Sequence, residues 1–508
     1  MYNYGHMKNN VNTSVVVNIV RTLTMTICSF ITFPYVCAIL GDKALGAYSW
    51  VSAFIYYFFI LARISIPNIA VREVVKVKDD PEKLSIKVQE LFIIQAVMTL
   101  ISFALMASLV LTIPAFQPTD NISYQALAFI LSLNFVTGVL SFEWVFTAFE
   151  KHVYLAIRSI IIYGIFDVLI FLFVKNPSHV TLYTFFVVAS TIVIVIANLI
   201  YLPKLVKFKK NYRYNFKQYL PILGMLFLIS VVVAIYDKTD AFLLGLFDTS
   251  KASVGSYSVG MKGVEIIIGI ITALSMVFIP RATHYLNTGD EKNYANLNKY
   301  SFNVALFIIL PAIATMATLS FPITSLISGS DLTNEYINAN WILTILSSLM
   351  LTYSLSFIIY TQILIPKKRE LIYFIAMATG CVLNIGLSFL FGLVVLPDAK
   401  SIGVAIATII SDVVVLTILL VFCWKDVKNT LFTFNNLKIG AVSGVIAGIS
   451  ALGSKYLIVG LSNVISNMTT IYILDLLIVV GVDAIIYIGA LFLLKEKLLR
   501  SFFKRLKQ

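Results

Sequence analysis

Four basic side chains lie where a membrane-embedded chain would not normally carry charge. They are Arg21, Arg63, Lys238 and Lys262, and each falls within a long apolar run. A cation in the hydrocarbon core costs roughly 2.5–3.5 kcal/mol on insertion scales. Each of these cations therefore needs an explanation. Either it has a structural role, in an ion pair or with its charged end at the membrane surface, or it binds an anion. Arginine suits phosphate because its planar fork meets two oxygens at once.

Polar and aromatic residues accompany two of these cations at helical spacing. Asn18 lies on the helical face of Arg21, and Tyr56 lies on the face of Arg63. A stripe of basic, aromatic and polar groups beside a water-filled cleft suits a phosphate that carries a sugar. We therefore predict a cavity that binds such an anion.

Acidic residues inside the apolar runs have two interpretations. Asp237 and Asp240 lie one turn apart, and Glu265 lies one turn from Lys262. They neutralise nearby cations, or they form a site for H⁺ or Na⁺, the two candidate coupling ions. Asp475 and Asp483 lie near the end of the chain and suit helix docking or an accessory groove.

The elements that must position these residues are membrane-spanning helices. The 508 residues are 59% hydrophobic and only 12% charged, whereas soluble chains are about 25% charged. The apolar runs are too long for barrel strands. We predict an all-α integral membrane protein of about fourteen helices. The predicted spans are 14–40, 44–70, 86–112, 121–148, 153–174, 179–202, 218–246, 253–279, 299–327, 336–365, 369–393, 400–424, 436–459 and 468–494.

The charges in the predicted loops indicate which side of the membrane each loop faces. With the N-terminus inside, every predicted inner segment carries basic residues, including Lys151 with Arg158, while the outer loops hold only scattered lysines such as Lys43 and Lys175. This bias follows the positive-inside rule and predicts a multi-pass protein with both termini cytoplasmic. The net charge of +13 is then mainly a topology signal, and nucleic acid is not an expected partner.

The chain also repeats itself. The stretch Leu45–Ser49 opens the second predicted helix and its echo, Val254–Ser258, opens the eighth. We predict two six-helix lobes related by a parallel pseudo-twofold axis. The predicted domains are 1–217 for the N-lobe and its basic linker, 218–428 for the C-lobe, and 429–508 for helices 13 and 14 with a basic cytoplasmic tail. The four buried cations fall on helices 1, 2, 7 and 8, which correspond in the two lobes, so we expect one shared cavity.

Motifs of soluble-enzyme chemistry are absent from the sequence. It contains no GxxxxGK[ST] loop, no HExxH and no GxSxG, and its four cysteines form no CxxC pair. We therefore expect neither an enzyme nor a bound cofactor or metal. The predicted outer loops are short, which counts against a catalytic domain outside the membrane.

Several motifs together resemble a known family, the polysaccharide-transporter branch of the multidrug/oligosaccharidyl-lipid/polysaccharide (MOP) flippase superfamily. The resemblance spans essentially the whole chain and rests on the order of loose motifs. They are Leu45–Tyr48, Glu143-Trp144 with Glu150-Lys151, Tyr236–Gly245, Val254–Ser258, Ile279–Arg281, Pro366–Lys368, and Asn384 before Gly403 and Ala405.

This resemblance implies a bacterial flippase for O-antigen or capsule repeat units. Such proteins move undecaprenyl-pyrophosphate-linked oligosaccharides across the cytoplasmic membrane by alternating access, through a cationic cavity whose basic residues match Arg21, Arg63 and Lys262. The implied partners are the lipid-linked oligosaccharide, membrane lipid, and a polysaccharide polymerase with chain-length proteins. On this basis the predicted substrate-binding residues are Arg21, Arg63, Lys262, Lys238, Tyr56, Tyr48 and Asn18, and the ion-coupling candidates are Asp237, Asp240 and Glu265.

Three alternatives stay open at this point. In the first, the cargo is a lipid II-type or teichoic-acid precursor, since lipid II flippases share the fourteen-helix plan. In the second, the protein is a cation-coupled multidrug exporter, although such exporters usually have twelve helices. In the third, it is a membrane polysaccharide polymerase, which the short outer loops disfavour. The sequence does not identify the sugar.

Overall fold

The structure, a computed structural model, describes residues 4–117, 122–208, 214–330, 332–431, 433–496 and 498–499. Side chains are described from residue 21 onward, apart from residues 22, 23, 26, 27, 30, 68, 220 and 225 within helices. This part of the chain is built from α-helices with short 3₁₀ and π turns, so the all-α prediction is confirmed.

Contacts divide the chain into two compact units, Met1–Lys251 and Ala252–Gln508. The predicted lobe boundaries rest on the sequence repeat, a different criterion from compactness, and they remain a prediction. The helices of the first unit are α1 (Tyr4–Arg63), α2 (Ile66–Val77), α3 (Pro81–Thr112), α4 (Tyr124–Leu140), α5 (Glu143–Ala148), α6 (His152–Phe173), α7 (Val180–Tyr201) and α8 (Leu220–Phe247). Those of the second are α9 (Ala252–Asn287), α10 (Glu291–Thr318), α11 (Ser320–Ser328), α12 (Ala339–Leu346), α13 (Leu349–Ile359), α14 (Glu370–Phe389), α15 (Lys400–Phe422), α16 (Trp424–Leu431), α17 (Phe434–Ser462) and α18 (Met468–Leu493).

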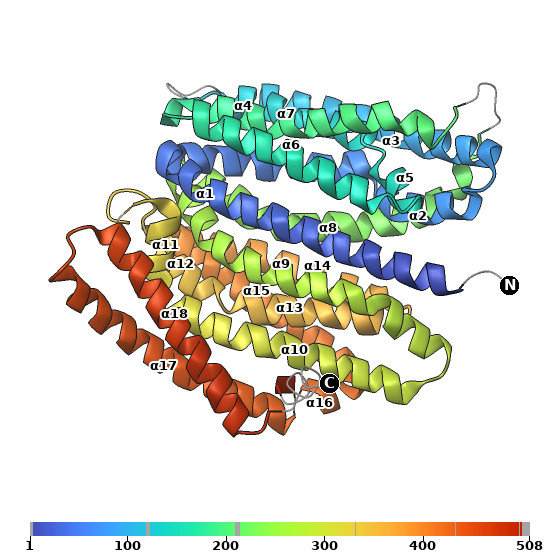
Figure 1. The fold of residues 1–508 in the computed structure, drawn as a ribbon. Helices are drawn as coiled ribbons and strands as arrows, with labels where there is room; N and C mark the ends of the chain where they lie inside the picture. The colour runs from blue at the N-terminus through green and yellow to red at the C-terminus, as the bar shows by residue number, and fades with distance from the viewer. Residues whose placement is uncertain are drawn as a thin grey trace. The chain divides into compact units, whose positions relative to one another are not determined.

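Helix α1 is two helices joined at a single residue. Gly41 has φ 71° and ψ 174°, a conformation that glycine adopts without the steric cost that a Cβ adds. The chain turns back there, and the two arms correspond to the first two predicted spans (Figure 1). A single glycine thus replaces the loop of this helical hairpin.

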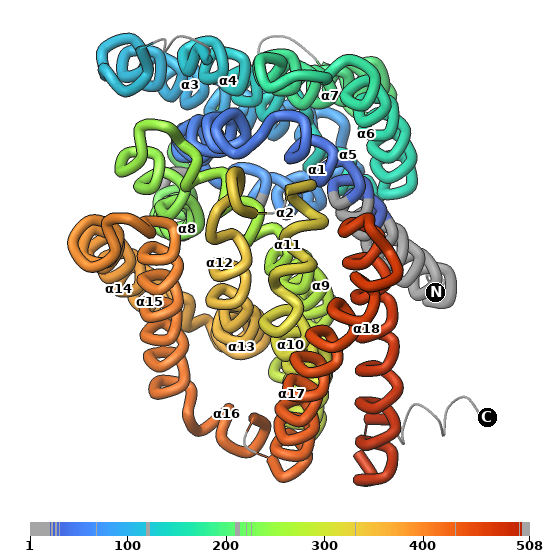
Figure 2. Tube along the Cα trace, turned by 90° about the vertical axis from the view of Figure 1, so that its left-hand side faces the viewer, coloured from blue at the N-terminus to red at the C-terminus, as the bar shows by residue number. Residues whose placement is uncertain are grey.

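Each unit is a helix bundle. In the first, α1 packs against α3, α4, α6 and α8, and α7 covers α4 and α6. In the second, α9 packs against α10, α12 and α13, α14 pairs with α15, and α17 pairs with α18 and packs on α10 (Figure 2). Polar caps fix helix starts: Asp80 accepts hydrogen bonds from the backbone N–H groups of Glu82 and Lys83 at the start of α3, as expected for an N-cap.

Two helices of the second unit end in π turns, Tyr360–Leu364 after α13 and Leu390–Val395 after α14. The second lies against α15 at Gly403, where an added Cβ would come within 2.5 Å of the Phe391 carbonyl oxygen. Such turns widen a helix locally and let a neighbour approach closely. The sequence pattern did not predict them.

The linker before α8 is anchored to α3. The Glu90 carboxylate accepts hydrogen bonds from the Tyr219 hydroxyl and the Asn215 backbone N–H, each at 2.7 Å. Burial and the hydrogen bond to Glu90 raise the pKa of Tyr219 well above its ordinary value.

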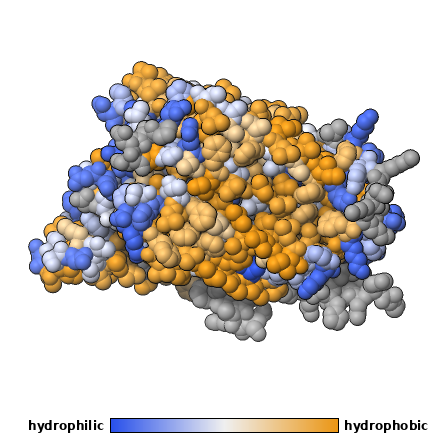
Figure 3. Space-filling model, turned by 90° about the horizontal axis from the view of Figure 1, so that it is seen from above, coloured by the Kyte–Doolittle hydropathy of each residue, from blue (hydrophilic) through white to orange (hydrophobic). Residues whose placement is uncertain are grey.

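Thirteen of the described helices are long and apolar enough to cross a membrane. The predicted number of spans is fourteen, and the difference lies at α1. There the sequence predicts two spans, whereas α1 contributes one such helix, Ile31–Arg63, because its first arm lies largely outside the residues whose side chains are described. Seen from above the view of Figure 1, apolar side chains cover the broad middle of the face and hydrophilic ones gather at its ends (Figure 3). The protein is a multi-pass membrane protein, because such a belt requires lipid as its solvent.

Candidate anion-binding cavity

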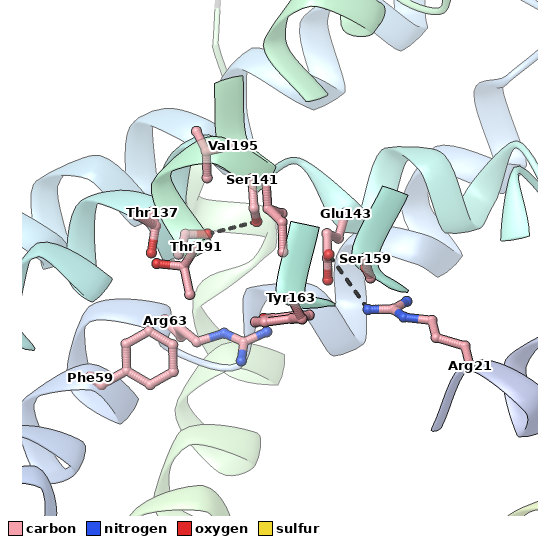
Figure 4. Close-up of a pocket in the computed structure, with 12 residues that line it drawn as sticks. Arg21, Phe59, Arg63, Thr137, Ser141, Glu143, Ser159, Tyr163, Thr191 and Val195 are labelled. Carbon is pink, nitrogen blue, oxygen red and sulfur yellow. Dashed lines mark hydrogen bonds and ion pairs between the residues drawn. The ribbon is translucent and has the colours of Figure 1, made fainter. Parts of the chain in front are cut away.

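A cavity of about 170 Å³ lies within the first unit, among α1, α4, α5, α6 and α7. Arg21 and Arg63 approach it from opposite sides, with Tyr163 between them (Figure 4). A single water needs roughly 10–15 Å³ of such space, so the cavity has room for a phosphate-sized group. It is lined by Arg21, Phe59, Arg63, Thr137, Gly138, Ser141, Glu143, Ser159, Tyr163, Thr191, Ile194 and Val195.

Both arginines line one cavity because of the bend in α1. Arg21 and Arg63 are almost equally far along the chain from Gly41, on opposite arms. At 1.5 Å per residue each lies about 30 Å along its arm from the bend. Since the arms run back beside each other, the two residues come to a similar depth. The predicted association of Arg21 with Arg63 in one cavity therefore has a simple geometric cause.

Arg63 packs on an aromatic ring and lies beyond ion-pair distance of the described acidic groups. Its guanidinium carbon lies 5.3 Å from the centre of the Phe59 ring, and among the described residues it forms no ion pair. Gly138 makes room for that ring, because an added Cβ would lie 3.1 Å from a Phe59 ring carbon. A ring face stabilises a cation by only about 0.5–2 kcal/mol, so Arg63 retains most of its capacity to bind an anion.

Glu143 links the cavity to two arginines. One carboxylate oxygen lies 3.7 Å from a terminal nitrogen of Arg21 and accepts a close hydrogen bond from Arg158. Glu143 begins α5 directly after Phe142, whose φ of 46° breaks the helix and separates α5 from α4. This break turns the carboxylate toward α1 and α6. It follows from packing, and the apolar run predicted over 121–148 does not reveal it.

Arg158 corrects one prediction made from loop charges. It was counted with Lys151 as an inner-segment charge, but it lies inside α6 with its side chain 5% exposed. A terminal nitrogen also donates to the Ile194 carbonyl oxygen at 3.1 Å. Two acceptors on different helices thus hold its terminal nitrogens, as a buried charge requires, while its Nε has no hydrogen-bond partner in the described structure.

Hydroxyl groups complete the cavity wall. Ser159 lines it, is fully buried, and its hydroxyl has no hydrogen-bond partner among the described residues. The Thr191 hydroxyl, by contrast, is within hydrogen-bond distance of both the Asn134 side-chain oxygen (3.1 Å) and the Val188 carbonyl oxygen (2.7 Å). An unused donor beside Arg21 and Arg63 suits an anion with several oxygen atoms.

The other predicted substrate-binding residues lie elsewhere. The ammonium of Lys238, on α8, lies 5.6 Å from the centre of the Tyr56 ring. Tyr48 packs edge-on against Tyr183, with ring centres 5.0 Å apart. None of these residues lines the cavity of Figure 4. Asn18 lies outside the residues whose side chains are described.

The ion-coupling candidates divide between the units. Asp237 and Asp240 are on α8 in the first unit, and Asp240 is buried. Lys262 and Glu265 are on α9 in the second unit, where their charged groups lie 3.8 Å apart. No group of three or more metal-binding side chains occurs in the described part of the chain. A cavity shared by Lys262 with Arg21 and Arg63 remains a prediction.

A second set of polar groups lies between α17 and α18. Asp475 is within 2.7 Å of the Ser454 hydroxyl, and Asp483 is closely bonded to Ser450. Both acids are buried, and each has a second carboxyl oxygen without a hydrogen-bond partner in the described structure. Tyr487, one turn beyond Asp483, donates to the Phe307 carbonyl oxygen of α10 at 2.8 Å. These bonds fit the docking role expected of the two acids.

Comparisons with known proteins agree on the type of protein. A sequence model of the family described as "Polysaccharide biosynthesis protein" matches residues 11–286. A protein of Escherichia coli (strain K12) named "Putative O-antigen transporter" is 23% identical over 397 residues, which cover 77% of this chain and 91% of that protein.

Two groups of solved structures share the fold. The lipid II flippase MurJ in an inward closed conformation has a TM-score of 0.67 at 18% identity, covering 93% of this chain and 100% of that chain. An inward-facing multidrug resistance MATE family transporter of the MOP superfamily has a TM-score of 0.59 at 14% identity, covering 82% and 99%. The expected all-α membrane fold is confirmed, and the chain shares it with these solved structures.

Proposed function

We propose, on the premise that the chain belongs to the polysaccharide biosynthesis protein family, that it carries lipid-linked oligosaccharides across the membrane. The family resemblance drawn from the motifs is confirmed by that match and by the E. coli relative. The proposed cargo is an undecaprenyl-pyrophosphate-linked repeat unit. The proposed location is the bacterial cytoplasmic membrane, with both termini inside.

The observation that carries this proposal is the cationic cavity. Arg63 forms no ion pair among the described residues, and Arg21 shares Glu143 with Arg158. Three arginines therefore stand beside one carboxylate, which leaves an excess of positive charge inside a membrane bundle. A diphosphate would supply the missing negative charge, and two guanidinium forks can hold its oxygen atoms. A cationic cavity of this kind is unsuited to cationic drugs.

In the proposed cycle the protein alternates between inward-open and outward-open states. The diphosphate binds Arg21 and Arg63, with Lys262 and Lys238 as further cations, and Tyr56, Tyr48 and Asn18 contact sugar or the groups next to the lipid. The prenyl tail stays in the bilayer. Asp237, Asp240 or Glu265 couples the cycle to an H⁺ or Na⁺ gradient. A polysaccharide polymerase and chain-length proteins would use the exported repeat units.

Complementation of a deletion strain tests this function. We expect wild-type protein to restore surface polysaccharide, and Arg21→Ala, Arg63→Ala and Lys262→Ala each to restore less, while lipid-linked intermediates accumulate. Lys83→Ala is the matched control, since Lys83 is exposed and pairs only with Asp80 at the surface. Wild-type amounts of polysaccharide from all three variants, at equal expression, would show that the cavity assignment is wrong.

The same strain separates the alternatives. An accumulated lipid that carries a peptide would indicate a lipid II-type cargo, and a polyol phosphate would indicate a teichoic-acid precursor. Sensitivity to drugs with normal polysaccharide would favour the multidrug exporter that the MATE-type fold also allows. Polymer growth from purified protein and lipid-linked sugar would favour the polymerase.

A further inference from the structure

Glu143 occupies the position that an anionic ligand of Arg21 would take. Its side chain is 40% exposed in the cavity, whereas that of Arg21 is 21% exposed and that of Arg158 is 5% exposed. Figure 4 shows the Arg21 guanidinium directed at the Glu143 carboxylate. The acid is thus accessible from the cavity and within ion-pair distance of the arginine.

The two ion pairs of Glu143 differ in strength. Arg158 donates a close hydrogen bond to the carboxylate and is itself fixed by the Ile194 carbonyl oxygen. Arg21 lies at 3.7 Å, beyond hydrogen-bond distance. A charge-assisted hydrogen bond is roughly twice as strong as a neutral one, whereas a loose, partly exposed ion pair contributes about 1 kcal/mol or less. Arg21 can therefore leave Glu143 while Arg158 still neutralises it.

We infer that Glu143 is a resident anion that competes with the phosphate of the cargo for Arg21, and that Arg158 is a positioning residue that keeps Glu143 in place. This inference rests on the proposed function, because it assumes that Arg21 binds a diphosphate. In the empty cavity Glu143 neutralises Arg21, which would otherwise be an uncompensated cation in the membrane. When the diphosphate binds, Arg21 exchanges one anion for another. When it leaves, Glu143 pairs with Arg21 again.

Such an exchange has a consequence for transport. A carrier must release its cargo, and a cavity with two unopposed arginines would hold a diphosphate tightly. The resident carboxylate lowers the affinity because the ligand must replace an existing ion pair rather than fill an empty site. Glu143 and the diphosphate are then negatively coupled, and coupling energies of this kind typically change affinity by about 5- to 150-fold.

Titration of the purified full chain with inorganic pyrophosphate tests this inference. The protein is held in nanodiscs of phosphatidylcholine, and binding is measured by isothermal titration calorimetry. We expect Glu143→Gln, which keeps the size and removes the charge, to bind pyrophosphate at least about fivefold more tightly than wild type. Glu150→Gln is the matched control, because Glu150 is exposed and does not line the cavity; its affinity should equal that of wild type.

A double-mutant cycle tests the role of Arg158. Arg158→Gln should weaken pyrophosphate binding several-fold, because Glu143 released from Arg158 pairs more closely with Arg21. Adding Glu143→Gln to this variant should restore affinity to at least the wild-type value, which a merely structural role of Arg158 would not do. Melting temperatures of all variants confirm that the compared proteins are folded.

The outcomes separate this inference from the proposed function. Binding that depends on Arg21 and Arg63 but is unchanged or weaker in Glu143→Gln would overturn the inference and leave the diphosphate site intact. An unrestored double variant would overturn the role of Arg158. Absence of Arg21-dependent binding in both wild type and Glu143→Gln would overturn the inference and count against the proposed cargo site as well.

Discussion

Two regions of the molecule hold acidic side chains inside membrane spans, and they satisfy them by different means. In the cavity of the first unit, Glu143 lies between Arg21 and Arg158. Between α17 and α18 of the second unit, Asp475 and Asp483 are bonded to Ser454 and Ser450, with no cation within ion-pair distance among the described residues. An ionic partner can be exchanged for an ionic ligand, whereas a serine partner cannot.

The hydroxyl group of Ser450, the serine bonded to Asp483, has two acceptors within reach. The Ser450 hydroxyl already donates to the Ile446 carbonyl oxygen at 2.9 Å, and a hydroxyl has only one proton to donate. This proton is therefore shared between the Ile446 carbonyl oxygen and the Asp483 carboxyl oxygen, to which Ser450 also donates. We interpret Asp483 as an acid that holds two helices together, and Glu143 as an acid that belongs to a binding site.

The largest expected effect comes from removing both cavity cations. Arg21→Ala combined with Arg63→Ala should weaken pyrophosphate binding at least about a hundredfold, because hydrogen bonds to charged groups contribute about 1.5–3 kcal/mol each and 1.4 kcal/mol is a factor of ten. The measurement is the same calorimetric titration.

The corresponding double lysine variant is its control. It should fall between wild type and the alanine pair, since lysine keeps the charge and loses the planar fork. If the double alanine variant bound pyrophosphate as tightly as wild type, the cavity would not be a binding site, and its acid would no longer differ in role from those between α17 and α18.

A smaller effect is expected from the acids of α17 and α18. Asp475→Ala with Asp483→Ala should destabilise the protein by about 1–3 kcal/mol, because hydrogen bonds between membrane helices contribute about 0.6 kcal/mol on average and up to about 1.7. The melting temperature in nanodiscs should fall while pyrophosphate affinity stays unchanged.

The matched asparagine pair should cost less, because an amide is neutral and still bonds to serine. If asparagine is as damaging as alanine, the hydrogen bond to serine does not by itself explain how these acids stabilise the protein.

The smallest effect concerns alkaline pH in the second unit. Cys423 follows α15 and is buried, and burial together with Asp426 raises the pKa of its thiol from 9.0 to about 11. The folded state keeps a proton that the unfolded state releases, so this contribution to stability is complete below pH 9 and is lost as the pH rises toward 11. The loss of stability amounts to about 1.4 kcal/mol by pH 10.

Melting temperatures of wild type and Cys423→Ala, measured from pH 8 to 11, test this. The wild-type curve should fall more steeply above pH 9. Parallel curves would contradict the prediction. Pyrophosphate binding by Cys423→Ala should match that of wild type, since Cys423 is not part of the cavity.

The spans themselves could be predicted closely from the sequence. The predicted runs 153–174 and 400–424 agree with α6 and α15 to within two residues at each end, because a long apolar run in lipid has no alternative to a helix. The breaks could not be predicted. The break at Phe142 and the two π turns have no signal in the hydropathy pattern of their runs.

The candidate site could be predicted only in part. Arg21 and Arg63 stand out because charge in an apolar run is costly. Arg158 was missed because it lies near the start of its span, where a basic residue resembles a loop charge. Its significance depends on Glu143, which follows a break that the pattern conceals. The available signal was an acidic residue and a basic residue in consecutive spans, both close to the loop that joins those spans.

The bend at Gly41 also bears on how the chain enters the membrane during synthesis. Because one residue joins the two arms of α1, almost no polar chain separates them, and only Asp42 and Lys43 follow the bend before the second arm continues. Once both arms have left the ribosome they can pair as a helical hairpin, in which each covers part of the polar surface of the other. Arg21 and Arg63 would then enter the bilayer together, before the helices that complete their cavity have been made.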